Sequence, residues 1–244
     1  MGFCRQGILV FAALTALSVP AAFAGSDAAP SFDCAKASSP DEKAICADPE
    51  LAAIDVLITA AFKDFKPAYG GDKKAIGRAL LADRKQCGAE RACIAAAESS
   101  ALQTYGYAPS WVAAYTEGMI GHKAMTFAAA ASKAVDQPMP KTLGQCALTH
   151  IAALTTRLGE DPLESADPSA GSLVRFSNDG IQVSYDRDYG LANSQAGDPV
   201  VVCLITIPRD CPAGDERGRV YYGVDLNLRG SWVLPDSQHM CGGA

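Results

Sequence analysis

The cysteines are the residues of this chain with the widest range of possible chemistry. The sequence has nine, and eight of them lie beyond residue 24. These eight are Cys34, Cys46, Cys87, Cys93, Cys146, Cys203, Cys211 and Cys241. A cysteine can act as a nucleophile, bind a metal or pair in a disulfide, and an even number in an exported chain favours disulfides. We therefore expect four disulfides.

The first four cysteines allow three pairings, and the sequence does not choose firmly among them. Cys34 with Cys46 and Cys87 with Cys93 is slightly favoured, because both loops are then short. A zinc cluster is the alternative, but the spacing contains no C-x-x-C pair. We expect no metal and no cofactor. Among the last four cysteines, one bond should join a helix to a sheet, and the other should hold the loop 208 to 212 or the C-terminal tail.

Two further groups of residues suggest chemistry at first sight. His239 and Cys241 could form a Cys-His nucleophile, since a neighbouring base activates a thiolate. A cysteine in a disulfide is no longer nucleophilic, so export argues against it. Asp186 and Asp188 suggest calcium, but their turn lacks the further carboxylates and the final Glu of an EF-hand loop. We predict no catalytic residue and do not expect an enzyme.

Residues 211 to 219 form a polar, glycine-containing loop with two arginines, Arg217 and Arg219. Loops on a rigid scaffold often carry binding residues, and a guanidinium can bind a carboxylate through two parallel hydrogen bonds. We expect this loop to contact another protein, where the arginines would enter a cleft lined with carboxylates. The simpler interpretation is a surface turn with local ion pairs.

The first 24 residues are typical of a secretory signal peptide. Arg5 precedes an apolar run over residues 8 to 19, and Ala22-Phe23-Ala24 is a small-x-small cleavage motif. The run is shorter than the about 20 residues that a permanent membrane helix needs, and Gly25 offers no site for a lipid. We expect a periplasmic or secreted protein without membrane insertion after cleavage.

The charge of the chain restricts its partners. It has 27 Asp and Glu against 21 Lys and Arg, a formal net charge of −6. Nucleic acid and anionic membranes attract clustered Lys and Arg, so neither is an expected partner. A basic protein is the better electrostatic match.

Helix signals dominate residues 39 to 104. The run Ser39-Pro40-Asp41-Glu42 predicts a helix start with a capping box, and Asp48-Pro49-Glu50 repeats the start signal. Apolar residues then recur at steps of three and four, which predicts helices over about 49 to 65, 72 to 87 and 90 to 102. The first two should form an antiparallel hairpin with the cysteines at one end.

Several stretches of this helical part match one family pattern. They are Ser31 to Ala37, Glu42 to Cys46 and Asp48 to Asp55, together with Arg84, Cys87, Cys93 and Ile94. Here the chain resembles the N-terminal domain of the LprI-type lysozyme-inhibitor family, over residues 31 to 104. It departs from that pattern at Leu80, Lys85, Glu98 and Ala101, where the family usually has Trp, Asp, Tyr and Arg. The resemblance implies a small disulfide-bonded helical domain of bacterial envelope or secreted proteins and, for some members, inhibition of lysozyme.

The middle of the chain, residues 105 to 140, is expected to be a connector with some helix, because Gly and Pro mark both ends. Trp111, Tyr115 and Met119 recur at four-residue steps. This spacing favours a helix face packed in the core, and a partner-binding face is the alternative.

After residue 140 the pattern changes. Residues 142 to 158 have an apolar stripe that predicts one more helix, whereas 172 to 176, 181 to 185, 200 to 207 and 220 to 226 are β-prone runs. Asn178-Asp179-Gly180 predicts a hairpin turn. Trp232 should begin a last strand and be buried. The run 200 to 207 is the most continuously apolar, so its strand should be central.

These observations predict an α+β fold: a disulfide-stapled N-terminal helical hairpin or three-helix module, then a helix packed on a small, mainly antiparallel sheet. The expected divisions are a signal peptide (1 to 24), an LprI-like helical domain (25 to 104), a connector (105 to 140) and an α+β domain (141 to 244). Our leading hypothesis is an exported bacterial envelope protein that binds another protein and inhibits lysozyme. The alternative is an envelope interaction module with an unknown partner.

Overall fold

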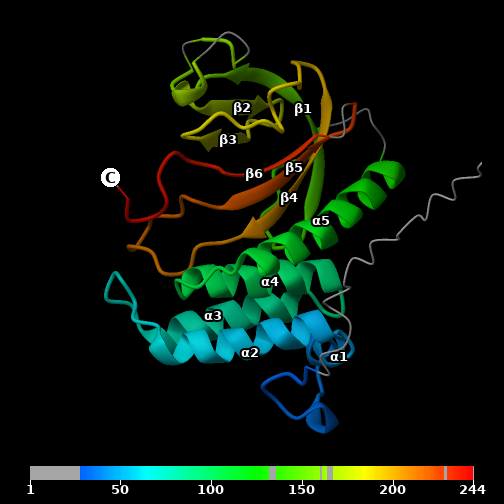
Figure 1. The fold of residues 1–244 in the computed structure, drawn as a ribbon, viewed down its shortest axis with the longest axis vertical. Coiled ribbons are helices and arrows are strands. Elements are labelled where there is room, and N and C mark those ends of the chain that lie inside the picture. Colours follow the sequence, from blue (N-terminus) through cyan, green and yellow to red (C-terminus); the bar gives the residue numbers. More distant parts are fainter. Residues whose placement is uncertain (1–27, 132–135, 160, 164–166, 228–229, 244) are drawn as a thin grey trace, which may run out of the picture.

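The computed structural model describes residues 28 to 131, 136 to 159, 161 to 163, 167 to 227 and 230 to 243. The expected signal peptide lies outside the described residues. The described chain is α+β, as predicted, with a layer of helices packed on one side of an antiparallel sheet (Figure 1).

Five α-helices follow a short 3₁₀ helix (Cys34–Lys36) in the described residues. They are α1 (Pro40–Cys46), α2 (Pro49–Asp64), α3 (Lys73–Gln86), α4 (Arg91–Thr104) and α5 (Ser110–Ala130). The capping box of Ser39 and Glu42 is present at the start of α1, and the Asp48 carboxylate accepts hydrogen bonds from the Glu50 and Leu51 N–H groups at the start of α2. The four N-terminal helices therefore begin where the local sequence predicts.

Helix α4 lies at the centre of the molecule. All eleven residues from Ala92 to Leu102 are buried, because α4 contacts α2 and α3 on one side and α5 and the sheet on the other (Figure 1). Its small side chains, mainly Ala and Ser, allow these neighbours to approach closely. One hydrophobic cluster joins Ile94 and Leu102 of α4 to Leu204 and Tyr221 of the sheet, so a continuous core crosses from the helices to the strands.

The sheet has six strands in the order β3-β2-β1-β4-β5-β6, and every neighbouring pair is antiparallel. The strands are β1 (Cys146–Thr155), β2 (Ser172–Phe176), β3 (Ile181–Ser184), β4 (Pro199–Thr206), β5 (Val220–Asp225) and β6 (Ser231–Pro235). Five of these were predicted, including the central position of β4. Asp179 has a positive φ of 66° in the predicted turn between β2 and β3, and Trp232 is buried in β6.

The helix predicted over residues 142 to 158 is wrong, because this segment forms strand β1. Each residue from Cys146 to Thr149 is buried, since β1 lies between β2 and β4 and has both faces covered. A strand buried on both faces shows no alternation of polar and apolar residues, so its apolar positions could imitate a helical stripe. Pairing with β4 overrides that local pattern.

The expected connector contains α5, which is 21 residues long. Its buried face consists of Val112, Thr116, Ile120, Ala124 and Ala128, and it packs on α4 and the sheet. The predicted core stripe of Trp111, Tyr115 and Met119 lies one residue earlier on the helix. The prediction is wrong for Trp111, because this residue is 41% exposed.

The sheet curls so that β3 and β6, its two edge strands, approach each other. Gln182 of β3 bridges the gap. Its buried amide donates to the carbonyl oxygens of Tyr221 and Leu234, each at 2.9 Å, and its oxygen accepts from the Trp232 indole N–H at 2.9 Å. This side chain thus closes the sheet around its inner core.

Four disulfides are formed among the described residues, as predicted. Cys34–Cys46 and Cys87–Cys93 are the favoured N-terminal pairs. Cys146–Cys203 joins strands β1 and β4, not a helix to the sheet as expected, because residue 146 lies in a strand. Cys211–Cys241 ties the loop after β4 to the C-terminal tail.

We predict that Gln182→Leu lowers the free energy of unfolding by at least about 2 kcal/mol. The leucine fills similar space but leaves the Trp232 N–H and two carbonyl groups buried without their partner, and each such loss costs about 1 to 3 kcal/mol. Denaturant unfolding followed by tryptophan fluorescence measures the change. Gln195→Leu alters an exposed glutamine and should change stability by less than about 0.5 kcal/mol. Equal stability of the two variants would contradict the assigned role of Gln182.

Candidate functional site

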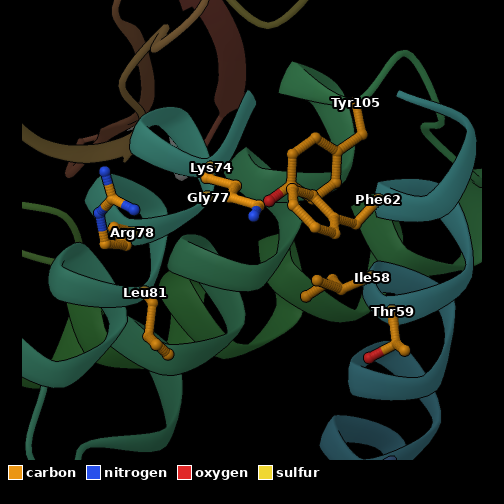
Figure 2. A pocket seen from close by; sticks show the side chains of 8 residues that line it. All are labelled: Ile58, Thr59, Phe62, Lys74, Gly77, Arg78, Leu81 and Tyr105. Carbon is orange, nitrogen blue, oxygen red and sulfur yellow. The ribbon is translucent and has the colours of Figure 1, made fainter. Parts of the chain in front are cut away.

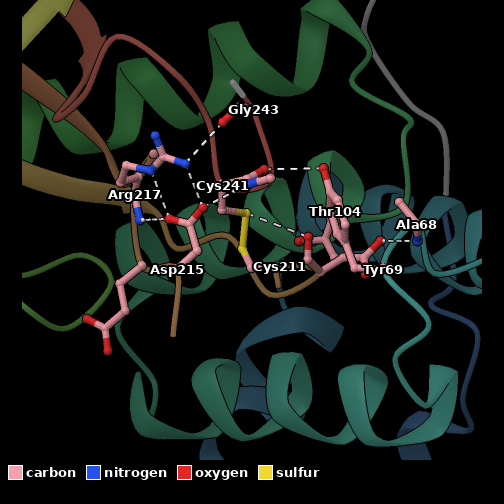
Figure 3. The surroundings of a disulfide bond; sticks show 12 residues. Ala68, Tyr69, Thr104, Cys211, Asp215, Arg217, Cys241 and Gly243 are labelled. Atoms are coloured by element: carbon pink, nitrogen blue, oxygen red, sulfur yellow. Dashed lines mark hydrogen bonds and ion pairs between the residues drawn. A yellow bond between two sulfur atoms is a disulfide. The ribbon is translucent and has the colours of Figure 1, made fainter. Parts of the chain in front are cut away.

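The loop between β4 and β5 carries the two arginines that the sequence predicts to bind a partner. Cys211 at the start of this loop is bonded to Cys241 of the tail, so the loop and the tail form one clamped unit beside the α2–α3 connection (Figure 3). We call residues 211 to 219 with residues 236 to 243 the clamped loop.

The base of the clamped loop is fixed to the helices by polar contacts. Arg209, just before the loop, forms two hydrogen bonds with the Asp83 carboxylate of α3, at 2.7 and 2.5 Å. Asp210 accepts a hydrogen bond from the Ala68 N–H at 2.8 Å, and the Tyr69 hydroxyl donates to the Cys241 carbonyl oxygen (Figure 3). These contacts join segments that are far apart in sequence and hold the loop in a defined position.

Arg217 contacts both segments of the clamped loop. Its guanidinium donates two hydrogen bonds to Asp215, at 3.0 and 2.8 Å, and a third to the Gly243 carbonyl oxygen at 3.1 Å (Figure 3). The Gly242 N–H also donates to Asp215. The Arg217 guanidinium, with the Gly242 N–H, holds the pKa of the Asp215 carboxyl well below its usual range. Both groups are therefore charged at neutral pH.

Arg219 is paired in the same way. Its guanidinium donates to the Glu216 carboxylate at 2.7 Å and lowers the pKa of that carboxyl. Arg217, Arg219 and Glu216 line a polar hollow of about 600 Å³, together with Asp236, whose pKa is raised by burial. The hollow thus presents fixed charges of both signs, a surface suited to recognising a charged partner.

The partner-binding role of Arg217 and Arg219 stays a prediction. The structure places both at one hollow, but each is paired with a carboxylate of its own loop. A partner's carboxylate would have to replace Asp215 or Glu216, or share the guanidinium with it. The local ion pairs of the simpler interpretation are thus present, and they do not exclude binding.

The other candidate pairs are not assembled into sites. Cys241 is in a disulfide, and His239 lies against the Tyr185 hydroxyl, 3.1 Å from its Nδ1. Asp188 accepts a hydrogen bond from the Leu191 N–H, and burial raises its pKa. Within the described residues, no group of three or more His, Cys, Asp and Glu side chains could hold a metal ion.

A second candidate site was not predicted from the sequence. It is an open, mostly apolar groove of about 400 Å³ between α2 and α3 (Figure 2). Ile58 and Phe62 contribute from α2, Gly77 and Leu81 from α3, and Tyr105 from the end of α4. We call this the α2–α3 groove. Gly77 was the one signal in the sequence that could have indicated this groove. A glycine is disfavoured inside a helix unless close packing requires it.

A buried charged cluster lies next to the groove. Arg84 of α3 contacts Asp41 at 3.0 Å, Asp55 at 3.2 Å and Glu98 at 3.8 Å. Three acidic groups therefore share one guanidinium. Glu98 is almost fully buried, and neither of its oxygens has a hydrogen-bond partner in the described part of the chain. Burial raises the pKa of Glu98 well above its usual range, against the opposing effect of Arg84.

The cluster and the groove adjoin. A small cavity of about 70 Å³ is lined by Arg84 and Glu98 and shares Gly77, Leu81 and Tyr105 with the groove. Glu98 thus lies between the charged cluster and the groove.

Comparison of the chain with protein-family models, with curated proteins and with solved structures gives no match. The resemblance to the LprI-type domain therefore remains an expectation carried by the motif residues. Any functional assignment depends on the geometry of the clamped loop and of the α2–α3 groove.

We predict that Glu98→Gln stabilises the protein at neutral pH. A carboxyl whose pKa is raised by folding releases its proton more readily in the unfolded chain, so the free energy of unfolding falls as pH rises above the ordinary value of 4.5. Each unit of the raised pKa corresponds to about 1.4 kcal/mol. The glutamine is neutral at every pH and should remove this decline.

Unfolding curves between pH 4 and pH 8 test this prediction. The wild type and Glu98→Gln should have similar stability at pH 4 and diverge as the pH rises. Glu117→Gln removes an exposed carboxylate of α5 and serves as the matched control. A wild-type profile that does not fall relative to Glu98→Gln would show that Glu98 does not titrate in this way.

Proposed function

We propose that this protein is an exported binding protein whose clamped loop contacts another protein, and that a lysozyme is that partner. The observation that carries the proposal is the Cys211–Cys241 bond, which fixes a hollow with Arg217 and Arg219 at its rim. A surface that is ordered before binding loses little conformational entropy when the partner arrives. The clamped loop meets this condition because its base is also bonded to the helices.

Charge supports a basic partner. The net charge of −6 attracts a basic protein over a distance and speeds association at low salt. The two arginines act at short range, where a guanidinium can bind the carboxylates of a substrate cleft. The molecule thus has a negative net charge, which attracts a basic protein from a distance, and two positive side chains for the local contact. This combination suits a ligand of a basic enzyme whose cleft is acidic.

The disulfides support export. Four disulfides are compatible with an oxidising compartment such as the periplasm or the extracellular space. No helix within the described ranges is long and apolar enough to cross a membrane. The family resemblance of residues 31 to 104 adds the expectation of a bacterial envelope protein.

We predict that residues 25 to 244, in micromolar excess, slow the lysis of cell walls by at least one lysozyme. Chicken-, goose- and invertebrate-type enzymes should each be assayed by the clearing of a cell-wall suspension. The inhibition should weaken as salt rises, because screening reduces the long-range attraction. Full lysis by all three enzymes would reject inhibition, and binding without inhibition would favour an envelope interaction module.

We predict that Arg217→Ala combined with Arg219→Ala weakens lysozyme binding by more than tenfold, because two charge-assisted contacts are lost. Calorimetry or surface plasmon resonance gives the dissociation constant. Arg175→Ala removes an exposed arginine of β2 and should leave affinity nearly unchanged. Unchanged affinity of the double variant would exclude these arginines from the contact.

A further inference from the structure

The α2–α3 groove has the size and lining of a small-molecule site. Its volume of about 400 Å³ lies in the range of about 300 to 1,000 Å³ that is usual for such sites. The rings of Phe62 and Tyr105 lie 5.5 Å apart at one end, and Ile58 and Leu81 extend the apolar wall away from them (Figure 2). Leu81 is 41% exposed, so this wall faces solvent. An apolar chain could lie along it.

Gly77 shapes the aromatic end of the groove. A Cβ atom at this position would lie 3.0 Å from the ring of Phe62 and 3.6 Å from the Tyr105 hydroxyl oxygen. Glycine inside a helix costs about 1 kcal/mol relative to alanine, so its place here follows from packing and not from helix propensity. The missing side chain lets the Phe62 ring lie directly against α3, where it forms one end of the groove with Tyr105.

The rim of the groove is positively charged. Lys74 and Arg78, one turn apart on α3, both line it (Figure 2). Lys74 has no ion pair among the residues that the structure describes. Arg78 has a distant one, 3.9 Å from Asp72, with both side chains mostly exposed. An exposed pair at that distance contributes little, so both cations can bind an external anion.

The base of the groove offers no unshared cation among the described residues. The adjoining cavity is lined there by Arg84 and Glu98, and the Arg84 guanidinium is already shared with the carboxylates of Asp41 and Asp55. An anion is therefore disfavoured at the base and favoured at the rim. This asymmetry sets the orientation of a ligand, with its charged end at Lys74 and Arg78 and its apolar part against Phe62 and Leu81.

We infer that the α2–α3 groove binds a single-chain anionic amphiphile of the fatty-acid class, with the carboxylate at Lys74 and Arg78 and the alkyl chain along Ile58, Phe62 and Leu81. This inference is independent of the clamped loop and of lysozyme. It rests on the apolar lining of the groove, on the close approach of the Phe62 ring to Gly77 and on the cationic rim.

Titration of the protein with dodecanoate, below its micelle concentration, tests the inference. Calorimetry should show binding, and the affinity should rise by about fourfold for each methylene added from octanoate to dodecanoate. The methyl NMR signals of Ile58 and Leu81 should shift. Dodecylammonium should bind at least about tenfold more weakly. Equal binding of the cationic amphiphile, shifts confined to other residues, or no binding of dodecanoate would overturn the inference.

Variants separate the two parts of the site. Lys74→Gln with Arg78→Gln should weaken dodecanoate binding by about fivefold and leave the binding of neutral dodecyl maltoside unchanged. Gly77→Leu should fill the groove and abolish binding of both, whereas Ala75→Leu, on the exposed face of α3, should not. The methyl shifts of the wild type keep the test decisive if Gly77→Leu does not fold. Arg217→Ala with Arg219→Ala should bind dodecanoate normally, so failure of the lysozyme test does not affect this result.

Discussion

The rest of the structure depends on the burial of helix α4 on all sides. A helix that is covered by two other helices on one side and by a helix and a sheet on the other needs mostly small side chains, and α4 has them from Ala95 to Ala101 with the single exception of Glu98. This close packing makes the helical part and the sheet share one core. The four disulfides each link residues within one of these parts. The joint between the parts therefore depends on packing around α4 and on polar contacts such as Arg209 with Asp83.

The same constraint explains the buried charges. Glu98 is on α4 and almost fully buried, and this burial raises the pKa of its carboxyl against the opposing effect of Arg84. Arg84 already compensates Asp41 and Asp55. Replacing a buried partner of such a network usually costs more than the network itself contributes. Arg84 thus stabilises the buried carboxyl groups around α4.

The sequence predicted correctly those elements whose formation depends on residues close to one another in the chain. Asp48 marked a helix start because its carboxylate accepts hydrogen bonds from free N–H groups of the same turn, and the start at Ser39 was marked because the Glu42 carboxylate accepts from the Ser39 N–H. Strand β1 was missed because its identity depends on β2 and β4, which lie on either side of it. The favoured N-terminal disulfides were predicted from loop length, whereas Cys146–Cys203 required the strand register. The groove was also missed because it depends on residues far apart in the sequence. Gly77 indicates a groove only when Phe62 and Tyr105 are known to lie against it.

Helix α3 connects the two candidate sites. Within seven residues it directs Arg78 and Leu81 to the groove, Asp83 to Arg209 at the base of the clamped loop, and Arg84 to the buried cluster. A helix turns about 100° per residue, so adjacent positions can face a solvent groove, a loop and the interior of the same molecule. The sites nevertheless differ in chemistry. The clamped loop has charged groups paired with one another, and its contacts must compete with those pairs. The groove has an apolar wall and cations with weak or no partners within the described chain, so a ligand there gains contacts without breaking strong ones.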